Sequence, residues 1–164
     1  MSRKTIALFA TALIVTTLLP SGVAAHAANS GVTVADAWVR ASEYSDHVGG
    51  MTGIFARITN HTEHTVVLIG GTTSISSVVQ THQVVNGMMS EKPNGIAIKP
   101  GETKVLQPGG LHVMLMNLKR PIVPGNKVRF TFVFKGAKSK PVTLLAKVAQ
   151  AGGESYTPSP TPTH

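Results

Sequence analysis

The sequence contains no cysteine. This absence excludes disulfide scaffolds, thiolate zinc sites, iron–sulfur clusters and thiol catalysis, so a bound metal would need ligands from His, Met, carboxylate or backbone groups. Charged residues make up only 13% of the 164 residues, whereas 42% are hydrophobic, so the chain is not wholly disordered and can bury one ordinary core. After residue 27 the basic residues are scattered singly except for Lys119-Arg120, which has no aromatic neighbour. The net charge of +8 therefore does not indicate nucleic-acid binding.

Motifs of common enzyme classes are also missing. The sequence has no G-x-S-x-G elbow, no H-E-x-x-H pair and no phosphate-binding glycine loop. Only seven acidic residues are present, which gives little support for catalysis by paired carboxylates. We therefore expect that the protein is not an enzyme.

Residues 1–27 have the pattern of a secretory signal peptide. Arg3 and Lys4 precede an apolar run over residues 6–19, and Ala25-His26-Ala27 fits the small-residue cleavage pattern. The apolar run is shorter than the roughly 20 residues that a bilayer requires, and no cysteine follows it that could carry a lipid. We expect an exported monomer without a stable membrane anchor, located in the periplasm, the cell envelope or the medium.

The chain after this segment is rich in short β-prone runs separated by turn residues, a pattern typical of a sandwich or barrel. No window of a dozen residues has helical periodicity, so we predict an all-β fold with a single domain over residues 31–149. A Pro- and Thr-rich tail, residues 150–164, is predicted to be disordered. The predicted strands are Val32–Arg40, Thr52–Thr59, His64–Ile69, Ser74–Val85, Gly95–Ile98, Thr103–Gln107, Leu111–Leu118, Lys127–Phe134 and Val142–Val148.

Histidine and methionine form the most informative pattern. Alternation along the predicted strand Leu111–Leu118 sends aliphatic side chains to one face and His112, Met114 and Met116 to the other. Residues two apart on a strand are separated by about 6.6 Å, which lets an imidazole and a thioether bind the same ion. The pair His112 and Met114 is therefore a candidate half of a metal site.

A second half is available in His82, on the predicted strand Ser74–Val85, and in Met88-Met89, on the predicted loop after that strand. If that loop folds over His112 and Met114, two imidazoles and two thioethers can surround one ion. Thioether sulfur is a poor ligand for hard cations and zinc, whereas Cu(I) accepts thioether and imidazole together. The ligand types therefore favour Cu(I).

Several stretches of the chain resemble a known family, the exported copper chaperones of the PCu(A)C type, which are small cupredoxin-like domains. The resemblance implies a cupredoxin-like Greek-key β-sandwich or barrel. The residues that carry it are Val34-Ala35-Asp36-Ala37-Trp38-Val39-Arg40, Gly50-Met51-Thr52-Gly53-Ile54-Phe55 with Asn60, and Pro108-Gly109-Gly110-Leu111-His112-Val113-Met114-Leu115-Met116-Asn117-Leu118.

The resemblance also implies a ligand set. The family has a His, ten intervening residues, a Met, roughly twenty-one intervening residues and a His-x-Met pair. His82, His112 and Met114 match the outer positions. The middle loop is about four residues shorter here, and Met89 is the predicted ligand because the segment after it matches the family's segment after the Met. Met88 is the alternative.

Members of this family carry Cu(I) outside the cytoplasm toward the binuclear copper site of cytochrome c oxidase. The implied partners are the copper-bearing oxidase subunit and a Sco-type protein. Two alternatives stay open: a copper-buffering or tolerance protein without a dedicated acceptor, and an Ig-like interaction module with incidental His and Met. Among other residues, His47 is expected to lie on an exposed loop, with an auxiliary ligand role together with Met51 as the alternative. His61 and His64 are expected to face solvent, and His164 ends the tail.

Overall fold

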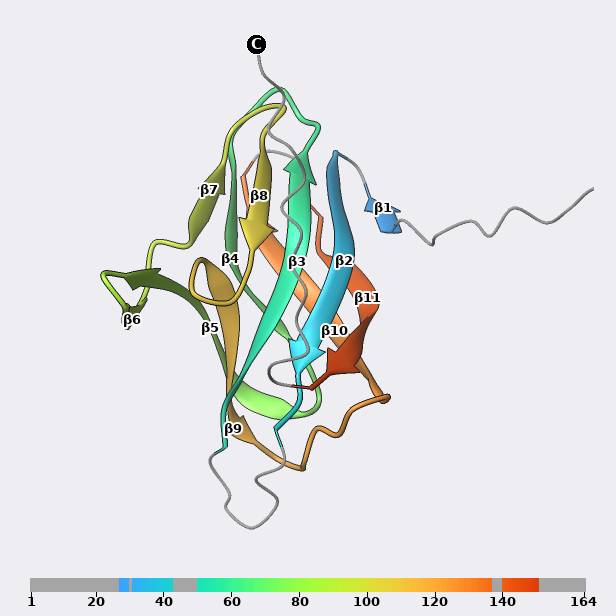
Figure 1. Ribbon diagram of the computed structural model, residues 1–164. Helices are drawn as coiled ribbons and strands as arrows, with labels where there is room; N and C mark the ends of the chain where they lie inside the picture. Colours follow the sequence, from blue (N-terminus) through green and yellow to red (C-terminus); the bar gives the residue numbers. More distant parts are fainter. Residues whose placement is uncertain (1–26, 30, 43–49, 137–139, 151–164) are drawn as a thin grey trace, which may run out of the picture.

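The computed structural model describes residues 27–29, 31–42, 50–136 and 140–150 (Figure 1). These residues form eleven strands and no helix, so none of them belongs to a helix that could cross a membrane. The all-β prediction is confirmed, and all nine predicted strands are present with ends that differ by at most three residues. The strands are β1 Ala27–Asn29, β2 Val32–Arg40, β3 Thr52–Asn60, β4 Val66–Thr72, β5 Ser76–Val85, β6 Met88–Glu91, β7 Ile96–Ile98, β8 Thr103–Leu106, β9 His112–Leu118, β10 Lys127–Lys135 and β11 Val142–Ala149.

The strands belong to one mixed sheet with the order β6-β5-β9-β3-β2-β11-β10-β4-β7, to which β1 adds beside β2 and β8 beside β3. All pairings are antiparallel except that of β11 with β2. β4 and β5 stand far apart in this order but contact each other, so the sheet curls around one core. The predicted signal peptide up to residue 26 and the tail after residue 150 lie outside the described residues.

The core is built from strands that alternate in burial. In β10, Val128, Phe130, Phe132 and Phe134 are buried, and Lys127 on the other face is exposed, as the alternation along this segment predicts. The rings of Phe130 and Phe132 are fully buried and meet edge to face with centroids 4.7 Å apart.

β3 changes its partner halfway along its length. Its first residues, 52–54, pair with β9, whereas residues 56–59 pair with β8. Between β8 and β9 the chain leaves the sheet in a short loop, which is closed by hydrogen bonds from the Gln107 amide to the Leu111 carbonyl (2.8 Å) and from the Gly110 amide to the Gln107 carbonyl (3.1 Å). This change of partner leaves a break in the sheet beside the start of β9.

The prediction that Met88-Met89 lie on a loop is wrong. These residues begin β6, which forms a hairpin with β5 through Asn86-Gly87. Both turn residues have positive φ, 51° and 75°, as a two-residue turn of type I′ requires. The Asn-Gly pair is a hairpin signal in the sequence, but all four residues of β6 are exposed, so the strand has no alternation to reveal it.

Candidate metal centre

The pairing around β9 determines which side chains share a face. His112 lies directly opposite His82 of β5, and Met114 lies opposite Gly53 of β3. Directly paired residues project to the same side of a sheet. The core contains the intervening residue Val113 but neither His112 nor Met114, so these two side chains project to the outer face.

The β5–β6 hairpin extends this outer face. Met89 pairs with Val84, two residues along β5 from His82, so Met89 and His82 are on the same side. Met88 pairs with Val85, and both therefore project to the opposite side. The register thus brings Met89, and not Met88, to the side of the sheet that carries His112.

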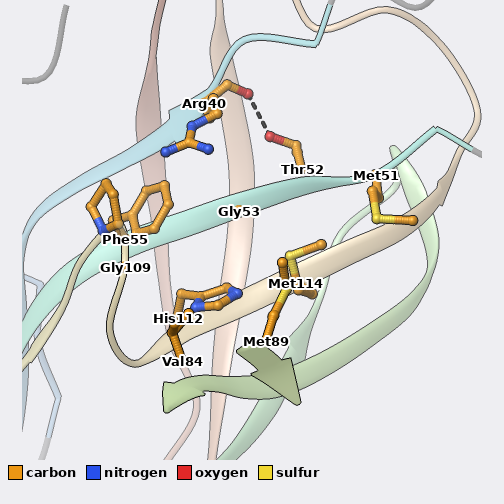
Figure 2. A pocket seen from close by; sticks show the side chains of 11 residues that line it. Arg40, Met51, Thr52, Gly53, Phe55, Val84, Met89, Gly109, His112 and Met114 are labelled. Carbon is orange, nitrogen blue, oxygen red and sulfur yellow. Dashed lines mark hydrogen bonds between the residues drawn. The ribbon is translucent and has the colours of Figure 1, made fainter. Parts of the chain in front are cut away.

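A pocket of about 240 Å³ lies on this outer face (Figure 2). It brings together three of the four predicted ligands, Met89, His112 and Met114, whereas His82 does not line it. Met51 also lines the pocket. The sequence had suggested it only as an alternative, an auxiliary ligand together with His47, which lies outside the described residues. The complete lining is Arg40, Met51, Thr52, Gly53, Phe55, Val84, Met89, Pro108, Gly109, His112 and Met114.

The donor side chains differ in their exposure to solvent. His112 and Met114 are each only 5% exposed, whereas Met89 is 54% and Met51 is 57% exposed. The pocket therefore has a buried floor on β9 and a rim of two solvent-accessible thioethers. His61 and His64 are exposed, as predicted, and lie outside this lining.

The imidazole of His112 is oriented for binding through one nitrogen. Its Nδ1 is 3.0 Å from the carbonyl oxygen of Gly110, in the loop between β8 and β9. A carbonyl oxygen can only accept, so Nδ1 carries the proton in the neutral ring and Nε2 keeps its lone pair. This arrangement of ligand and supporting carbonyl is typical of histidines that bind metals.

The ring of His112 is held between two other rings. Phe55 lies on one side with a centroid separation of 6.1 Å, and His82 on the other at 5.7 Å. Phe55 itself packs against Trp38 at 4.4 Å, and the guanidinium of Arg40 lies 5.6 Å from the Phe55 ring centroid. These contacts restrict the imidazole to one orientation at the pocket floor.

His82 keeps one nitrogen without a hydrogen bond. Its Nε2 is 3.2 Å from the Gln80 amide oxygen, whereas its Nδ1 is buried and has no partner among the described residues. Burial lowers the pKa of His82, and a charge on His112 lowers it further, against a smaller opposing effect of Glu91. The lowered pKa favours the neutral ring, in which Nε2 donates to Gln80 and Nδ1 has an unused lone pair.

The chemistry of the pocket is that of soft, uncharged donors. Within the described residues, no three His, Asp or Glu side chains come together as a metal site. The pocket instead combines one imidazole with thioethers, a set that suits a soft monovalent ion better than a hard divalent one.

Comparison with known proteins identifies the family. Residues 32–146 match the family described as "Putative lipoprotein LpqE-like". The chain belongs to the LpqE-like family. It is 37% identical over 130 residues to "Putative lipoprotein Lxx21020" of Leifsonia xyli subsp. xyli, covering 77% of this chain and 75% of the relative. The 164 residues of the LpqE-like chain contain no cysteine.

Three solved structures show the same fold. The copper-bound PCuAC domain from PmoF2 superposes with a TM-score of 0.63 at 23% identity, covering 75% of this chain and 96% of that domain. For DR1885 from Deinococcus radiodurans, the Cu(I) form gives 0.56 at 23% identity over 75% of this chain and 83% of that one. The apo form gives 0.54 at 26% identity over 93% and 98%. The predicted resemblance to PCu(A)C-type domains, with their cupredoxin-like fold, is confirmed.

Proposed function

We propose that this LpqE-like protein is an extracytoplasmic copper chaperone, a carrier and not an enzyme, which binds one Cu(I) through His82, Met89, His112 and Met114. The observation that carries the proposal is the pocket in which His112, Met89 and Met114 meet. Two structural relatives, the copper-bound PCuAC domain from PmoF2 and the Cu(I) form of DR1885, support copper as the cargo.

The oxidation state follows from the donors. Thioether and imidazole are neutral, so they leave the full charge of the ion uncompensated, and a monovalent ion is easier to hold in such a pocket than a divalent one. Cu(I) is also the ion that accepts thioether sulfur most readily. The lone pair on Nε2 of His112 and the buried floor of the pocket are consistent with this cargo.

His82 and Met89 have different grounds for inclusion. His82 has a free Nδ1 lone pair and a ring 5.7 Å from that of His112, so it would reach the ion from the β5 side. Met89 shares the pocket with His112, whereas Met88 projects to the other side of β6. The register therefore favours Met89 over Met88 as the thioether ligand from this hairpin.

Delivery follows from the weakness of neutral ligands. Thiolates hold Cu(I) more strongly than thioethers, so an acceptor with cysteine ligands would take the ion without catalysis. By its family resemblance, the expected acceptor is the copper-bearing subunit of cytochrome c oxidase, together with a Sco-type protein. The signal-like segment, and the name of the Leifsonia relative as a lipoprotein, support export to the envelope or beyond.

The site is tested with a double variant, His112→Gln with Met114→Leu. We expect binding of one Cu(I) by the parent protein in native mass spectrometry under reducing conditions. Loss of outer-shell partners already weakens metal sites about 10- to 100-fold, so the double variant should weaken binding by at least about 100-fold. Met116→Leu, on the same strand but outside the pocket lining, is the control.

Affinity is measured by competition with a Cu(I) chelator, and strand content by circular dichroism. Unchanged affinity in the double variant would contradict the site, and failure of the parent protein to take up Cu(I) would favour an interaction module. In a deletion strain, oxidase activity that is lost and then restored by added copper supports the chaperone role. Copper sensitivity with normal oxidase activity would instead indicate copper buffering.

A further inference from the structure

Met51 lies in the same pocket as the proposed ligands, although it comes from another part of the chain. It immediately precedes β3, and its side chain lines the pocket with Met89 and Met114. Figure 2 shows Met51 and Met89 on either side of Met114, one from the start of β3 and one from β6. Three thioethers therefore line the same pocket as the imidazole of His112.

The backbone on both sides of Met51 is fixed. The Gly50 carbonyl accepts a 3.0 Å hydrogen bond from the Leu118 amide at the end of β9. The Thr52 hydroxyl, which is buried, donates a 2.7 Å hydrogen bond to the Arg40 carbonyl at the end of β2. The backbone of Met51 is thus fixed beside the pocket, because both of its neighbours are held by hydrogen bonds.

The residue opposite Met114 leaves room for this arrangement. Gly53 pairs directly with Met114 and has no side chain to fill the space above it. A Cβ atom at position 53 would lie 2.7 Å from the Phe55 ring, so the glycine keeps both the ring and the pocket in place. The opening lets the side chain two residues earlier, that of Met51, share the space over Met114.

Ordinary packing does not account for the position of Met51. It does not belong to the core, and 57% of its surface is exposed, so a polar residue would cost little there. Met88 is similarly exposed at 71% but lies outside the pocket. Met51 and Met88 are therefore both exposed, but only Met51 lies in the pocket with the other soft donors.

We propose that Met51 supplies a further Cu(I) ligand, a third thioether at the rim of the site, so that the ion has three sulfur neighbours instead of two. This inference rests on the proposed Cu(I) function. Met51 and Met89 are the exposed donors of the pocket, so an incoming thiolate acceptor would reach these two thioethers before Met114 or His112.

The direct test uses the unmodified protein with carbon-13-labelled methionine methyl groups. On addition of one equivalent of Cu(I), the methyl resonances of Met51, Met89 and Met114 are expected to shift. Those of Met88 and Met116, which do not line the pocket, should stay in place. X-ray absorption should count three sulfur neighbours around the ion.

Met51→Leu supplies the second test, with Met88→Leu as its matched control. Removing a direct ligand should cost no less than removing an outer-shell partner, so Met51→Leu is expected to weaken Cu(I) binding about tenfold or more and to lower the sulfur count from three to two. Met88→Leu should change neither quantity. Both positions are exposed, so neither variant threatens folding.

The outcomes separate this inference from the function on which it rests. Uptake of one Cu(I) with an unshifted Met51 methyl group, and with unchanged affinity in Met51→Leu, overturns the inference alone. If the parent protein binds no Cu(I), the proposed function fails and the inference fails with it.

Discussion

Strands β9 and β10 differ in which of their faces are buried. In β10 only one face is buried, and Lys127 and Arg129 on the other face meet solvent. In β9, residues 112–115 are all buried, with aliphatic side chains toward the core and His112 and Met114 on the outer face. A buried outer face made of imidazole and thioether therefore contributes a binding site, whereas a buried inner face contributes stability.

The largest loss of stability is expected on the inner face, from Phe130→Ala. Truncation of a fully buried phenylalanine leaves a cavity and costs about 3–5 kcal/mol in the free energy of unfolding. The preceding residue, Arg129, is exposed, so Arg129→Ala should change that free energy by no more than about 0.5 kcal/mol. Denaturant unfolding measures both, and equal effects would remove the distinction between the two faces of β10.

Gly87→Ala is expected to have an intermediate effect on stability. Gly87 has a φ of 75° with open space around it, so the cost is backbone strain of about 1–2 kcal/mol. Gly101, with a φ of 72° and equally open surroundings, is the matched control in a turn away from the pocket.

The two glycine variants should lose similar stability, but only Gly87→Ala should weaken Cu(I) binding, because its hairpin carries Met89. Denaturant unfolding and chelator competition measure the two quantities. Loss of affinity in Gly101→Ala as well would show that binding follows overall stability and not the geometry of the hairpin.

Met114→Leu should change stability little but should clearly weaken Cu(I) binding. Exchange of methionine for leucine conserves volume and usually costs less than about 1.5 kcal/mol. Removal of the sulfur should nevertheless weaken Cu(I) binding about tenfold or more. A destabilisation as large as that of Phe130→Ala, with unchanged copper affinity, would place Met114 in the core and contradict the comparison.

The fold was predictable wherever the burial of one strand face produces an alternating hydrophobic pattern in the sequence. In segments such as Lys127–Phe134, one face carries only hydrophobic residues and the other carries mostly polar ones. The strand and its buried face therefore follow from periodicity alone. β6 was missed because it is exposed on both faces. Only Asn86-Gly87 marks that hairpin, through the turn conformation that it adopts.

The site was predictable only in part. His112 and Met114 share a face because of their spacing along one strand, a local property. The choice between Met88 and Met89 depends on the register between β5 and β6, which the turn length sets. The approach of Met51 depends on the pairing of β3 with β9, whose residues are about sixty positions apart in the chain, and spacing within a short motif carries no information on that pairing.

The adjacent methionines of β6 make the pocket rim tolerant of a change in the pairing register of β6 with β5. A slip of one residue in the pairing of β6 with β5 would exchange the faces of Met88 and Met89. Since the two side chains are identical, the hairpin would still offer sulfur at the rim. The same slip in β9 would replace the imidazole of His112 by the isopropyl group of Val113, so a change of register would keep a sulfur donor at the rim but remove the imidazole from the floor.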